Sequence, residues 1–501
     1  MTEHPPGREG VPFADPAISR RKFLHGVAGA ALLCSLEGPT RTVLGRHTSA
    51  AFRAQRRKRF APFESELPIP PVLDPVSTEG GVDRYEITMR PGQQQILEGE
   101  PTQILGYEGV FPGPTIKAER DRPVEVVQRN ELGTGEDVVV HLHGGVNRPE
   151  HDGHPDDVIP PGGEYTYRYP NRQRAATLWY HEHGHGYTAK GVYAGRAGLY
   201  LVDDPEERAL DLPRGEYDVP LVICDRSFDE DNQLLYPSSF PIDGFYGNTI
   251  LVNGAVIPRM RVERRLYRFR ILNASNARRF ELVLSHGAEM IQIGADSGGL
   301  FPRPVKRPVI SLCPAERADV IIDFREFTPG SELVLRNRVG NEATRRVMRF
   351  DVVRGGREEA RVPKRLRDPV LWPEVVGERT FTLDFQANPE PEWQINGKGF
   401  DHNRIDAEPR LGTAELWHWV NTGPSLHPMH THLAHFQVVS VGGRKPDRAD
   451  RQAMKDTVLV GPNETVTVKV LFAGFPGRYV FHCHALEHGD KDMMAQMRVL
   501  P

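Results

Sequence analysis

Histidines at alternate positions are the most informative feature of this sequence. The chain has 20 histidines among 501 residues, and a random arrangement would give about 0.8 His-x-His pairs. Five pairs are present: His141/His143, His181/His183, His183/His185, His430/His432 and His482/His484. Chance does not account for this number, so a shared chemical role is indicated.

A spacing of two residues has a direct geometric meaning. Side chains two positions apart in a β-strand point to the same face of the sheet, so each pair would present two imidazoles to one site. Four such pairs would supply eight nitrogen ligands. Because imidazole binds copper, zinc, iron and nickel, the pairs predict a metal cluster without fixing the metal.

Cys483 adds a second kind of ligand to the last pair. It lies between His482 and His484, so in a strand its thiol would point to the face opposite the two imidazoles. A thiolate that faces away from the cluster requires a metal of its own. These three residues would therefore join two metal sites by a short covalent path for electrons.

A mononuclear site can be assembled around this thiolate. His488 and Met493 follow Cys483 five and ten residues later, and His427 precedes the third pair at an odd spacing, which directs it away from that pair. One cysteine, two histidines and a weak axial methionine define a blue-copper electron-transfer site. The metal is therefore predicted to be copper, with Met494 as the alternative axial ligand.

The complete pattern resembles the multicopper oxidases, the family of laccases, bilirubin oxidases and ascorbate oxidases. The resemblance extends from about residue 80 to the end of the chain. It rests on His141-Leu-His143-Gly, Trp179-Tyr-His181-Glu-His183, His427-Pro-Met-His430-Thr-His432 and His482-Cys483-His484. Further stretches, among them Phe111-Pro-Gly-Pro-Thr-Ile and Pro314-Ala-Glu-Arg-Ala-Asp, are similar to the branch of bacterial spore-coat laccases and bilirubin oxidases.

The resemblance implies a cofactor of four copper ions and assigns a ligand set to each type of copper. These sets are His427, Cys483, His488 and Met493 for type 1, His141 and His430 for type 2, and His143, His181, His183, His432, His482 and His484 for the type 3 pair. Cys483, with His482 and His484, would carry electrons from the type 1 ion to the other three.

The implied activity is the one-electron oxidation of phenolic, aromatic amine or tetrapyrrole donors, coupled to the four-electron reduction of dioxygen to water. The partners would be dioxygen and a small-molecule reducing substrate. The alternative is a cuprous or metal-ion oxidase, or a copper-tolerance protein. Such relatives tend to carry a Met-rich insertion, whereas this chain has 10 methionines and no Met-rich loop, so organic donors are favoured.

Reduction of dioxygen also consumes protons, which carboxylates near the cluster can deliver. Asp152 matches an acidic position of the family in the loop after the first pair and is expected to deliver protons, with a turn-capping role as the alternative. Close relatives carry an acidic residue directly after the position of His488, where this chain has Gly489. Glu487 or Asp490 would have to replace it.

One stretch also satisfies a metalloprotease motif. His181-Glu182-His183-Gly184-His185 matches H-E-x-x-H. That motif requires a helix, and the glycines at 184 and 186 make this stretch poor helix material. A zinc protease is therefore not expected, and the sequence leaves open whether His185 lies near the metal or at the surface.

β-Sandwiches are the elements expected to position these residues. From about residue 80 onward, short runs of β-formers alternate with Gly, Pro, Asn and Asp, and no long stretch has the apolar period of a helix. The prediction, with the resemblance, is an all-β fold of three consecutive cupredoxin-like Greek-key β-sandwich domains at 66–205, 206–370 and 371–501. The histidine pairs fall in the first and third domains, so the middle domain is expected to be structural and to lack copper ligands.

Composition restricts the partners and the redox chemistry. The 63 Lys and Arg nearly balance the 67 Asp and Glu, which gives a net charge of −4, so neither nucleic acid nor an anionic membrane is an expected partner. Four cysteines do not make a disulfide framework. Cys224 and Cys313 either form one bridge or remain two buried thiols.

The N-terminus carries a targeting pattern. Ser19-Arg20-Arg21-Lys22-Phe23-Leu24 is a twin-arginine motif, and the apolar run at 26–36 is too short to span a bilayer. Residues 1–65 are predicted to be an export signal and a flexible leader. The expected location is secreted or extracytoplasmic, in the periplasm or cell wall, without stable membrane insertion, and the oligomeric state stays open.

Overall fold

The structure of the chain is a computed structural model, which describes residues 61–239, 242–356, 358–387 and 392–501. The predicted twin-arginine signal and all of the predicted leader up to residue 60 lie outside the described residues. Strands dominate the described part, and the predicted all-β fold is confirmed.

Each of the six sheets takes its strands from one of three successive stretches of the chain. The first stretch forms sheets with the strand orders β2-β1-β4-β6 and β3-β8-β7-β5. Its strands are β1 Asp83–Gln94, β2 Thr102–Tyr107, β3 Gly113–Glu119, β4 Val124–Asn130, β5 Val140–His143, β6 Glu164–Tyr169, β7 Ala176–Glu182 and β8 Ala197–Asp203. Because the chain passes repeatedly between the two sheets, the stretch has the crossing connections of a Greek key.

The second stretch forms the orders β11-β10-β9-β13-β18-β15-β16 and β12-β20-β19-β14-β17. Its strands are β9 Asp218–Arg226, β10 Thr249–Val252, β11 Ala255–Val256, β12 Arg259–Glu263, β13 Leu266–Asn273, β14 Phe280–Leu284, β15 Met290–Ala295, β16 Gly299–Arg307, β17 Ile310–Leu312, β18 Arg317–Asp323, β19 Glu332–Asn337 and β20 Arg346–Val353.

The third stretch forms the orders β22-β21-β23-β27-β25 and β26-β24-β28-β29. Its strands are β21 Val375–Gln386, β22 Glu392–Ile395, β23 Ala414–Asn421, β24 His427–Thr431, β25 His435–Val441, β26 Thr457–Val460, β27 Thr465–Leu471, β28 Gly477–Cys483 and β29 Met494–Val499. The predicted boundaries near 205 and 370 fall between the three stretches, and as boundaries they stay a prediction.

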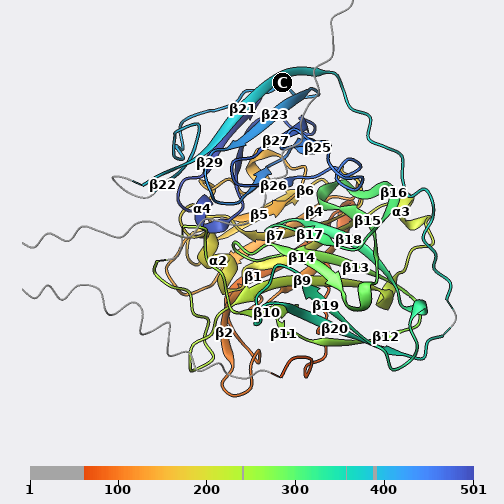
Figure 1. The fold of residues 1–501 in the computed structure, drawn as a ribbon. Helices are drawn as coiled ribbons and strands as arrows, with labels where there is room; N and C mark the ends of the chain where they lie inside the picture. The colour runs from red at the N-terminus through yellow and green to blue at the C-terminus, as the bar shows by residue number, and fades with distance from the viewer. Residues whose placement is uncertain (1–60, 240–241, 357, 388–391) are drawn as a thin grey trace, which may run out of the picture. The chain divides into compact units, whose positions relative to one another are not determined.

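The helices of the described residues are short and lie in connections. The α-helices are α2 Thr188–Ala194, α3 Pro205–Arg208 and α4 Leu486–Gly489, and the 3-10 helices are η1 Glu79–Gly81, η2 Pro149–His151, η3 Gly215–Tyr217, η4 Ser285–Gly287, η5 Asp296–Gly298 and η6 Phe324–Glu326. Helices α2 and α4 lie side by side (Figure 1). Within the described ranges, no helix has both the length and the apolar character needed to cross a bilayer.

Each stretch packs its two sheets around an apolar core. In the first, Ile87 and Val126 of one sheet share a core with Leu178 and Tyr200 of the other. Strand β4 alternates buried and half-buried residues, as expected for a strand with one face on a core. Strands β5 and β7 are instead buried at every position, because one face packs on this core and the other faces the second and third stretches. In Figure 1 the blue strands of the third stretch lie above β5 and β7.

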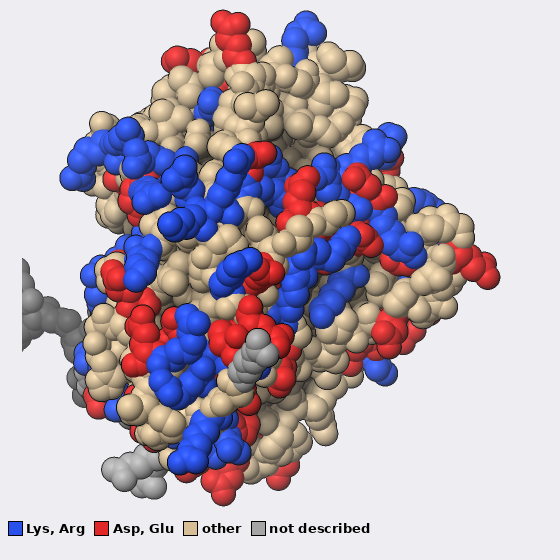
Figure 2. All heavy atoms as spheres, turned by 90° about the vertical axis from the view of Figure 1, so that its right-hand side faces the viewer, with Lys and Arg blue, Asp and Glu red and all other residues tan. Residues whose placement is uncertain are grey.

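Charged side chains of both signs share the surface. Figure 2 shows Lys and Arg interleaved with Asp and Glu over one face. Ion pairs join the two signs, as between Arg349 and Glu332 at 3.1 Å or Arg84 and Glu125 at 3.0 Å. Exposed pairs of this kind contribute little to stability, so the apolar cores hold the fold together. Cys224 and Cys313 are both buried and are free thiols, so the bridge between them does not form.

Candidate metal centre

The first two histidine pairs lie on neighbouring strands. Strands β5 and β7 are antiparallel, with His141 opposite His181 and His143 opposite Trp179. His183 directly follows β7, and all four histidine side chains are buried. The predicted same-face geometry therefore brings the imidazoles of both pairs to one edge of the first sandwich.

The other two pairs lie on an equivalent pair of strands in the third stretch. Strands β24 and β28 are antiparallel, with His430 opposite His482 and Met429 opposite Cys483. The His482 ring reaches the first stretch, because its Nε2 is 3.1 Å from Nε2 of His183. Two of the six sheets thus meet through their histidines.

Three imidazole nitrogens converge on one point at this junction. The Nε2 atoms of His183, His432 and His482 are separated by 3.1 Å, 3.2 Å and 3.2 Å. Beside them, Nε2 of His141 lies 3.4 Å from Nε2 of His430. Such contacts between nitrogens that lack a shared proton are unfavourable unless a cation lies between them.

A further set of three rings completes the cluster. The ring centroids of His143, His181 and His484 are 5.0 to 5.8 Å apart. Among the described residues, the Nε2 atoms of all three are buried without a hydrogen-bond partner. Buried polar atoms are normally satisfied, so these nitrogens also have the chemistry of metal ligands.

Cys483 faces the opposite side of β28 and meets two other histidines. Its Sγ is 3.6 Å from Nδ1 of His427 and 3.6 Å from Nδ1 of His488, and those two nitrogens are 3.3 Å apart. All three side chains are buried. Cys483 therefore groups with His427 and His488, while its neighbours His482 and His484 face the cluster.

The two candidate methionines lie on different sides of the last strand. Met494 pairs across the sheet with His482 and lines a small pocket beside it. Met493 belongs to the same apolar core as Cys483, and its backbone oxygen accepts a hydrogen bond from the Cys483 N–H. This arrangement favours Met493 over Met494 as the neighbour of the thiol.

In most cluster histidines the ring nitrogen that faces away from the cluster, Nδ1, is hydrogen-bonded to a backbone or carboxylate oxygen. Each Nδ1 that meets such an oxygen carries the proton and donates it, so the lone pair of Nε2 points into the cluster. The contacts are His141 to the Asp152 carbonyl at 2.5 Å, His181 to the Glu182 carbonyl at 2.7 Å, His430 to the Asp456 carbonyl at 2.8 Å, His482 to the Cys483 carbonyl at 3.1 Å and His432 to Oδ2 of Asp152 at 2.6 Å.

Burial keeps these imidazoles neutral. It lowers the pKa of His181 to about 3 and that of His482 to about 4. Burial and the adjacent His482 ring hold the pKa of His183 well below its usual value. Neutral imidazoles have a free lone pair at ordinary pH, which is the form that binds a metal.

Comparison with known proteins identifies the kind of centre. Two models of the multicopper oxidase family match residues 88–207 and 375–501. The laccase of Bacillus subtilis (strain 168) is 37% identical, over 87% of this chain and 98% of that protein. The chain belongs to the multicopper oxidase family. The bilirubin oxidase of Albifimbria verrucaria is 35% identical, over 89% of this chain and 83% of that protein.

Solved structures agree with the sequence matches. A laccase from Pediococcus acidilactici superimposes with a TM-score of 0.82 at 33% identity, over 88% of this chain and 95% of that one. A variant of the multicopper oxidase McoA from Aquifex aeolicus gives 0.80 at 32% identity, over 87% and 100%. The three sandwiches are therefore cupredoxin-like, as predicted. This multicopper oxidase is a laccase-like oxidoreductase with dioxygen as electron acceptor and copper as cofactor.

The donor atoms fit copper. Nitrogens that each lie about 2.0 Å from one first-row metal ion are about 3.3–3.5 Å apart, close to the 3.1–3.4 Å between the Nε2 atoms of this multicopper oxidase. A cysteine with two histidines is the donor set of a blue-copper centre. Burial raises the pKa of the Cys483 thiol, so a bound cation is required to keep it as the thiolate.

Asp152 contacts the cluster directly. Its Oδ2 accepts the 2.6 Å hydrogen bond from His432, and its carbonyl accepts the bond from His141. Its Oδ1 is buried without a hydrogen-bond partner among the described residues. The turn-capping alternative therefore does not describe its side chain, while its proton-delivery role stays a prediction.

Glu487 and Asp490 are the two carboxylates that could replace an acidic residue at position 489, and their hydrogen-bond partners differ. Glu487 accepts hydrogen bonds from Asn276 at 2.8 Å and from Tyr236 at 3.0 Å. Asp490 accepts from the backbone N–H groups of Thr188 at 3.0 Å and Ala189 at 2.8 Å, at the start of α2. Only Asp490 of the two lines the small pocket that reaches the cluster.

That pocket is the opening from the cluster toward α2 and α4. It has a volume of about 20 Å³, enough for a water molecule. His183 and His482 line it on the cluster side, and its other lining residues include His185, Gly489 and Asp490. Nε2 of His185 donates to Oδ1 of Asp492 at 3.0 Å, so His185 belongs to the pocket wall and not to the cluster. Because His181 and Glu182 end strand β7, the H-E-x-x-H stretch is not helical.

Several residues at the centre were not predicted from sequence. Arg317 and Asp456 form a buried ion pair beside His143 and His430. Although burial opposes its ionisation, Arg317 keeps the pKa of Asp456 below the usual range. Arg317 lies within the Pro314–Asp319 landmark, to which the sequence assigned no role. Arg317 is flanked there by Glu316 and Asp319, so no local sequence signal distinguishes it.

Proposed function

We propose that twelve side chains hold four copper ions in this laccase-like oxidase, in the sets that the sequence predicted. His427, Cys483, His488 and Met493 hold type 1; His141 and His430 hold type 2; and His143, His181, His183, His432, His482 and His484 hold the type 3 pair. Within the type 3 set, the convergent Nε2 atoms support one trio of His183, His432 and His482. The grouped rings of His143, His181 and His484 support the other.

One observation carries this proposal. Cys483 lies 3.6 Å from each of two histidine nitrogens on one side of β28, while His482, its neighbour in sequence, lies 3.1 Å from His183 on the other. The two centres are therefore joined by the chain itself. A cysteine-histidine dipeptide is a short covalent path between a site that accepts single electrons and a site that uses four.

Bound copper would supply the redox chemistry, in which four single-electron oxidations of the donor, together with four protons, reduce one dioxygen to two waters. The protein's residues orient the copper ligands, shield both centres from bulk water and connect the two centres. Burial of every proposed ligand excludes bulk water from both centres. Trp393 stacks on the His488 ring at a centroid distance of 4.0 Å, and the carbonyl of Ile242 accepts a 2.9 Å hydrogen bond from His488 Nε2. This edge of His488 is the proposed entry for electrons, because Ile242 is exposed.

Asp152 is proposed to be a positioning residue for the cluster. Its 2.6 Å hydrogen bond to His432 and the bond from His141 to its carbonyl fix two proposed ligands of different copper types. Carboxylates that accept from a metal-bound imidazole set its orientation and raise its basicity.

The proposed donors are phenols, aromatic amines or tetrapyrroles. The support is the likeness to proteins named laccase and bilirubin oxidase, together with the low methionine content. Export through a twin-arginine signal at Arg20 and Arg21 is part of the same proposal. It is tested by replacing both arginines with lysine and measuring whether the oxidase still leaves the cytoplasm.

The test is an optical spectrum and a copper assay of the copper-loaded enzyme and of Cys483→Ser, with oxygen uptake on phenols, bilirubin and cuprous ion. We expect an intense blue band, four copper ions per chain and uptake with organic donors, and the loss of the band and of one copper in the variant. Cys313→Ser is the matched control, because Cys313 is also a buried free thiol. A wild-type enzyme without a blue band would refute the ligand sets, and uptake with cuprous ion alone would refute the organic donors.

A further inference from the structure

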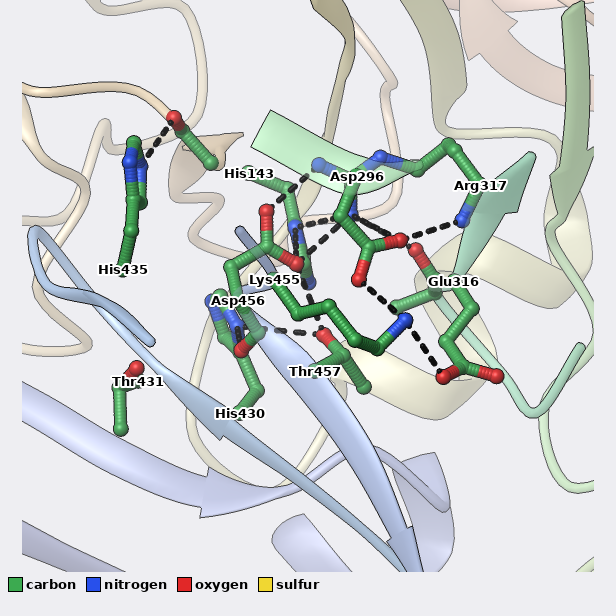
Figure 3. Close-up of polar contacts among 12 residues, drawn as sticks. His143, Asp296, Glu316, Arg317, His430, Thr431, His435, Lys455, Asp456 and Thr457 are labelled. Carbon is green, nitrogen blue, oxygen red and sulfur yellow. Dashed lines mark hydrogen bonds and ion pairs between the residues drawn. The ribbon is translucent and has the colours of Figure 1, made fainter. Parts of the chain in front are cut away.

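A buried ion pair joins the second and third stretches beside the histidine cluster. Arg317 begins β18, and Asp456 immediately precedes β26; they are 1% and 0% exposed. Nη1 of Arg317 donates to Oδ1 of Asp456 at 2.7 Å, and Nη2 donates to Oδ2 at 2.6 Å. Two parallel bonds of this kind fix the carboxylate plane as well as its charge. Figure 3 shows the pair next to His143 and His430.

Asp456 reaches proposed ligands of two copper types from two different stretches. Its carbonyl accepts the hydrogen bond from Nδ1 of His430 at 2.8 Å. Its Oδ1 lies 3.6 Å from Nδ1 of His143. One residue therefore faces the outer nitrogen of a type 2 ligand and of a type 3 ligand.

His143 Nδ1 has two charged neighbours, and the position of the ring proton determines which of them interacts favourably with it. Nδ1 of His143 is 3.3 Å from Nη1 of Arg317 and 3.6 Å from Oδ1 of Asp456. When Nε2 binds a metal, the ring proton is on Nδ1, which must then donate. A guanidinium has no acceptor, so a proton on Nδ1 is favoured by the Asp456 carboxylate and not by Arg317. At 3.6 Å the carboxylate is beyond hydrogen-bond reach and acts on this proton through its charge, in the orientation that Arg317 gives it.

Further contacts hold Arg317 in place. Its Nε donates to the carbonyl of Thr177 in β7 at 2.9 Å, and Nη1 donates to the carbonyl of Ala315 at 3.0 Å. Next to it, Lys455 bridges Asp296 at 2.8 Å and Glu316 at 2.9 Å (Figure 3). The guanidinium is thus bound to all three stretches of the chain at once.

We propose that Arg317 and Asp456 are a positioning pair for the type 2 and type 3 copper ions, which makes the middle domain a working part of the oxygen-reducing centre. The charge of the Asp456 carboxylate favours the proton of His143 on Nδ1, and the Asp456 carbonyl anchors His430. This proposal rests on the ligand sets proposed above.

The experiment uses two variants of the copper-loaded full-length enzyme. Arg317→Lys keeps the positive charge but cannot make the two parallel hydrogen bonds, and Asp456→Asn keeps the side-chain shape but removes the negative charge. Arg268→Lys is the matched control. Arg268 makes an equally buried two-pronged pair with Asp319 of β18, at 2.9 and 2.5 Å, away from the proposed ligands. Copper content, the electron paramagnetic resonance signal of type 2 copper, the blue band, and kcat and KM are measured for each.

We expect type 2 copper to be held about 10-fold to 100-fold more weakly in both pair variants, with an altered resonance signal and a lower kcat. The blue band and KM for the organic donor stay as in the wild type, and Arg268→Lys keeps its type 2 signal. If one of the two variants folds poorly, the other still tests the positioning role of the pair. An unchanged signal and copper content in a folded pair variant, or the same loss in Arg268→Lys, overturns the positioning role of Arg317 and Asp456 and leaves the ligand sets intact. A wild-type enzyme without four coppers overturns the ligand sets as well.

Discussion

The two proposed copper centres are built in different ways. His427, Cys483, His488 and Met493 all come from the third stretch, where β24, β28 and the short helix α4 place them. The cluster takes four of its eight histidines from β5, β7 and the residue after β7, and four from β24, β28 and the residues directly after them, with Arg317 of the middle stretch beside them. A site within one sandwich depends on local strand geometry, whereas a site between sandwiches depends on how the domains dock. The cluster is therefore the part most sensitive to changes elsewhere in the chain.

His183→Ala should separate the two centres most clearly. His183 belongs to the trio of nitrogens 3.1–3.2 Å apart, so its loss removes cluster copper and abolishes oxygen uptake, while the blue band of type 1 is kept. His185→Ala, two residues away and bonded to Asp492, is the control and should retain turnover. Copper assay, spectrum and oxygen uptake give the result, and loss of the blue band in His183→Ala would show that the centres are not independent.

Asp152→Asn should have the next largest effect. The amide cannot accept the 2.6 Å hydrogen bond from His432 as strongly as the carboxylate does, and changes of this kind cost about 10-fold to 100-fold in activity or metal affinity. KM for the organic donor should not change, because Asp152 does not touch the type 1 set. Asp492→Asn serves as the control in steady-state kinetics, and equal kcat for both variants would contradict the positioning role.

Removal of copper should destabilise the contact between the first and third stretches at the histidine cluster more than it destabilises the middle domain. A ligand at about 1,000 times its dissociation constant stabilises the folded state by about 4 kcal/mol, and without it the converging nitrogens of His183, His432 and His482 are left facing one another. The melting temperature should fall on chelation. Amide hydrogen exchange should rise in β5 and β7 more than in β13, and an equal rise in all three strands would argue against a metal-dependent junction.

The smallest effect is expected at a contact between the first and third stretches that involves no metal. His154 lies 3.0 Å from Gln496, and burial lowers its pKa to about 4. Because its unfolded value is about 6.5, the neutral ring favours the folded state, and this stability is lost as pH falls from about 6.5 toward 4. His154→Gln should make the free energy of unfolding less pH-dependent in that window, by up to about 1 kcal/mol per pH unit. The measurement is the melting temperature of both proteins as a function of pH. Parallel curves for variant and wild type would contradict this.

Sequence alone predicted the parts of the site that follow from local periodicity. The alternation of a strand placed Cys483 opposite His482 and His484, and it separated His427 from His430, because these directions are fixed within a few residues. It did not find Arg317 beside His143 or Ile242 on His488. Those contacts join residues 174 and 246 positions apart, and they depend on how sandwiches dock, which no spacing rule describes.

The position of β28 after the other strands that carry cluster histidines has a consequence for biosynthesis. His482 and His484 meet histidines that were made some 300 residues earlier, so the cluster cannot close until residue 484 has emerged from the ribosome. Closure of the cluster around its metal must then follow synthesis of β5, β7 and β24. A product terminated before residue 482 would lack both His482 and Cys483, and would neither reduce oxygen nor bind the full copper complement.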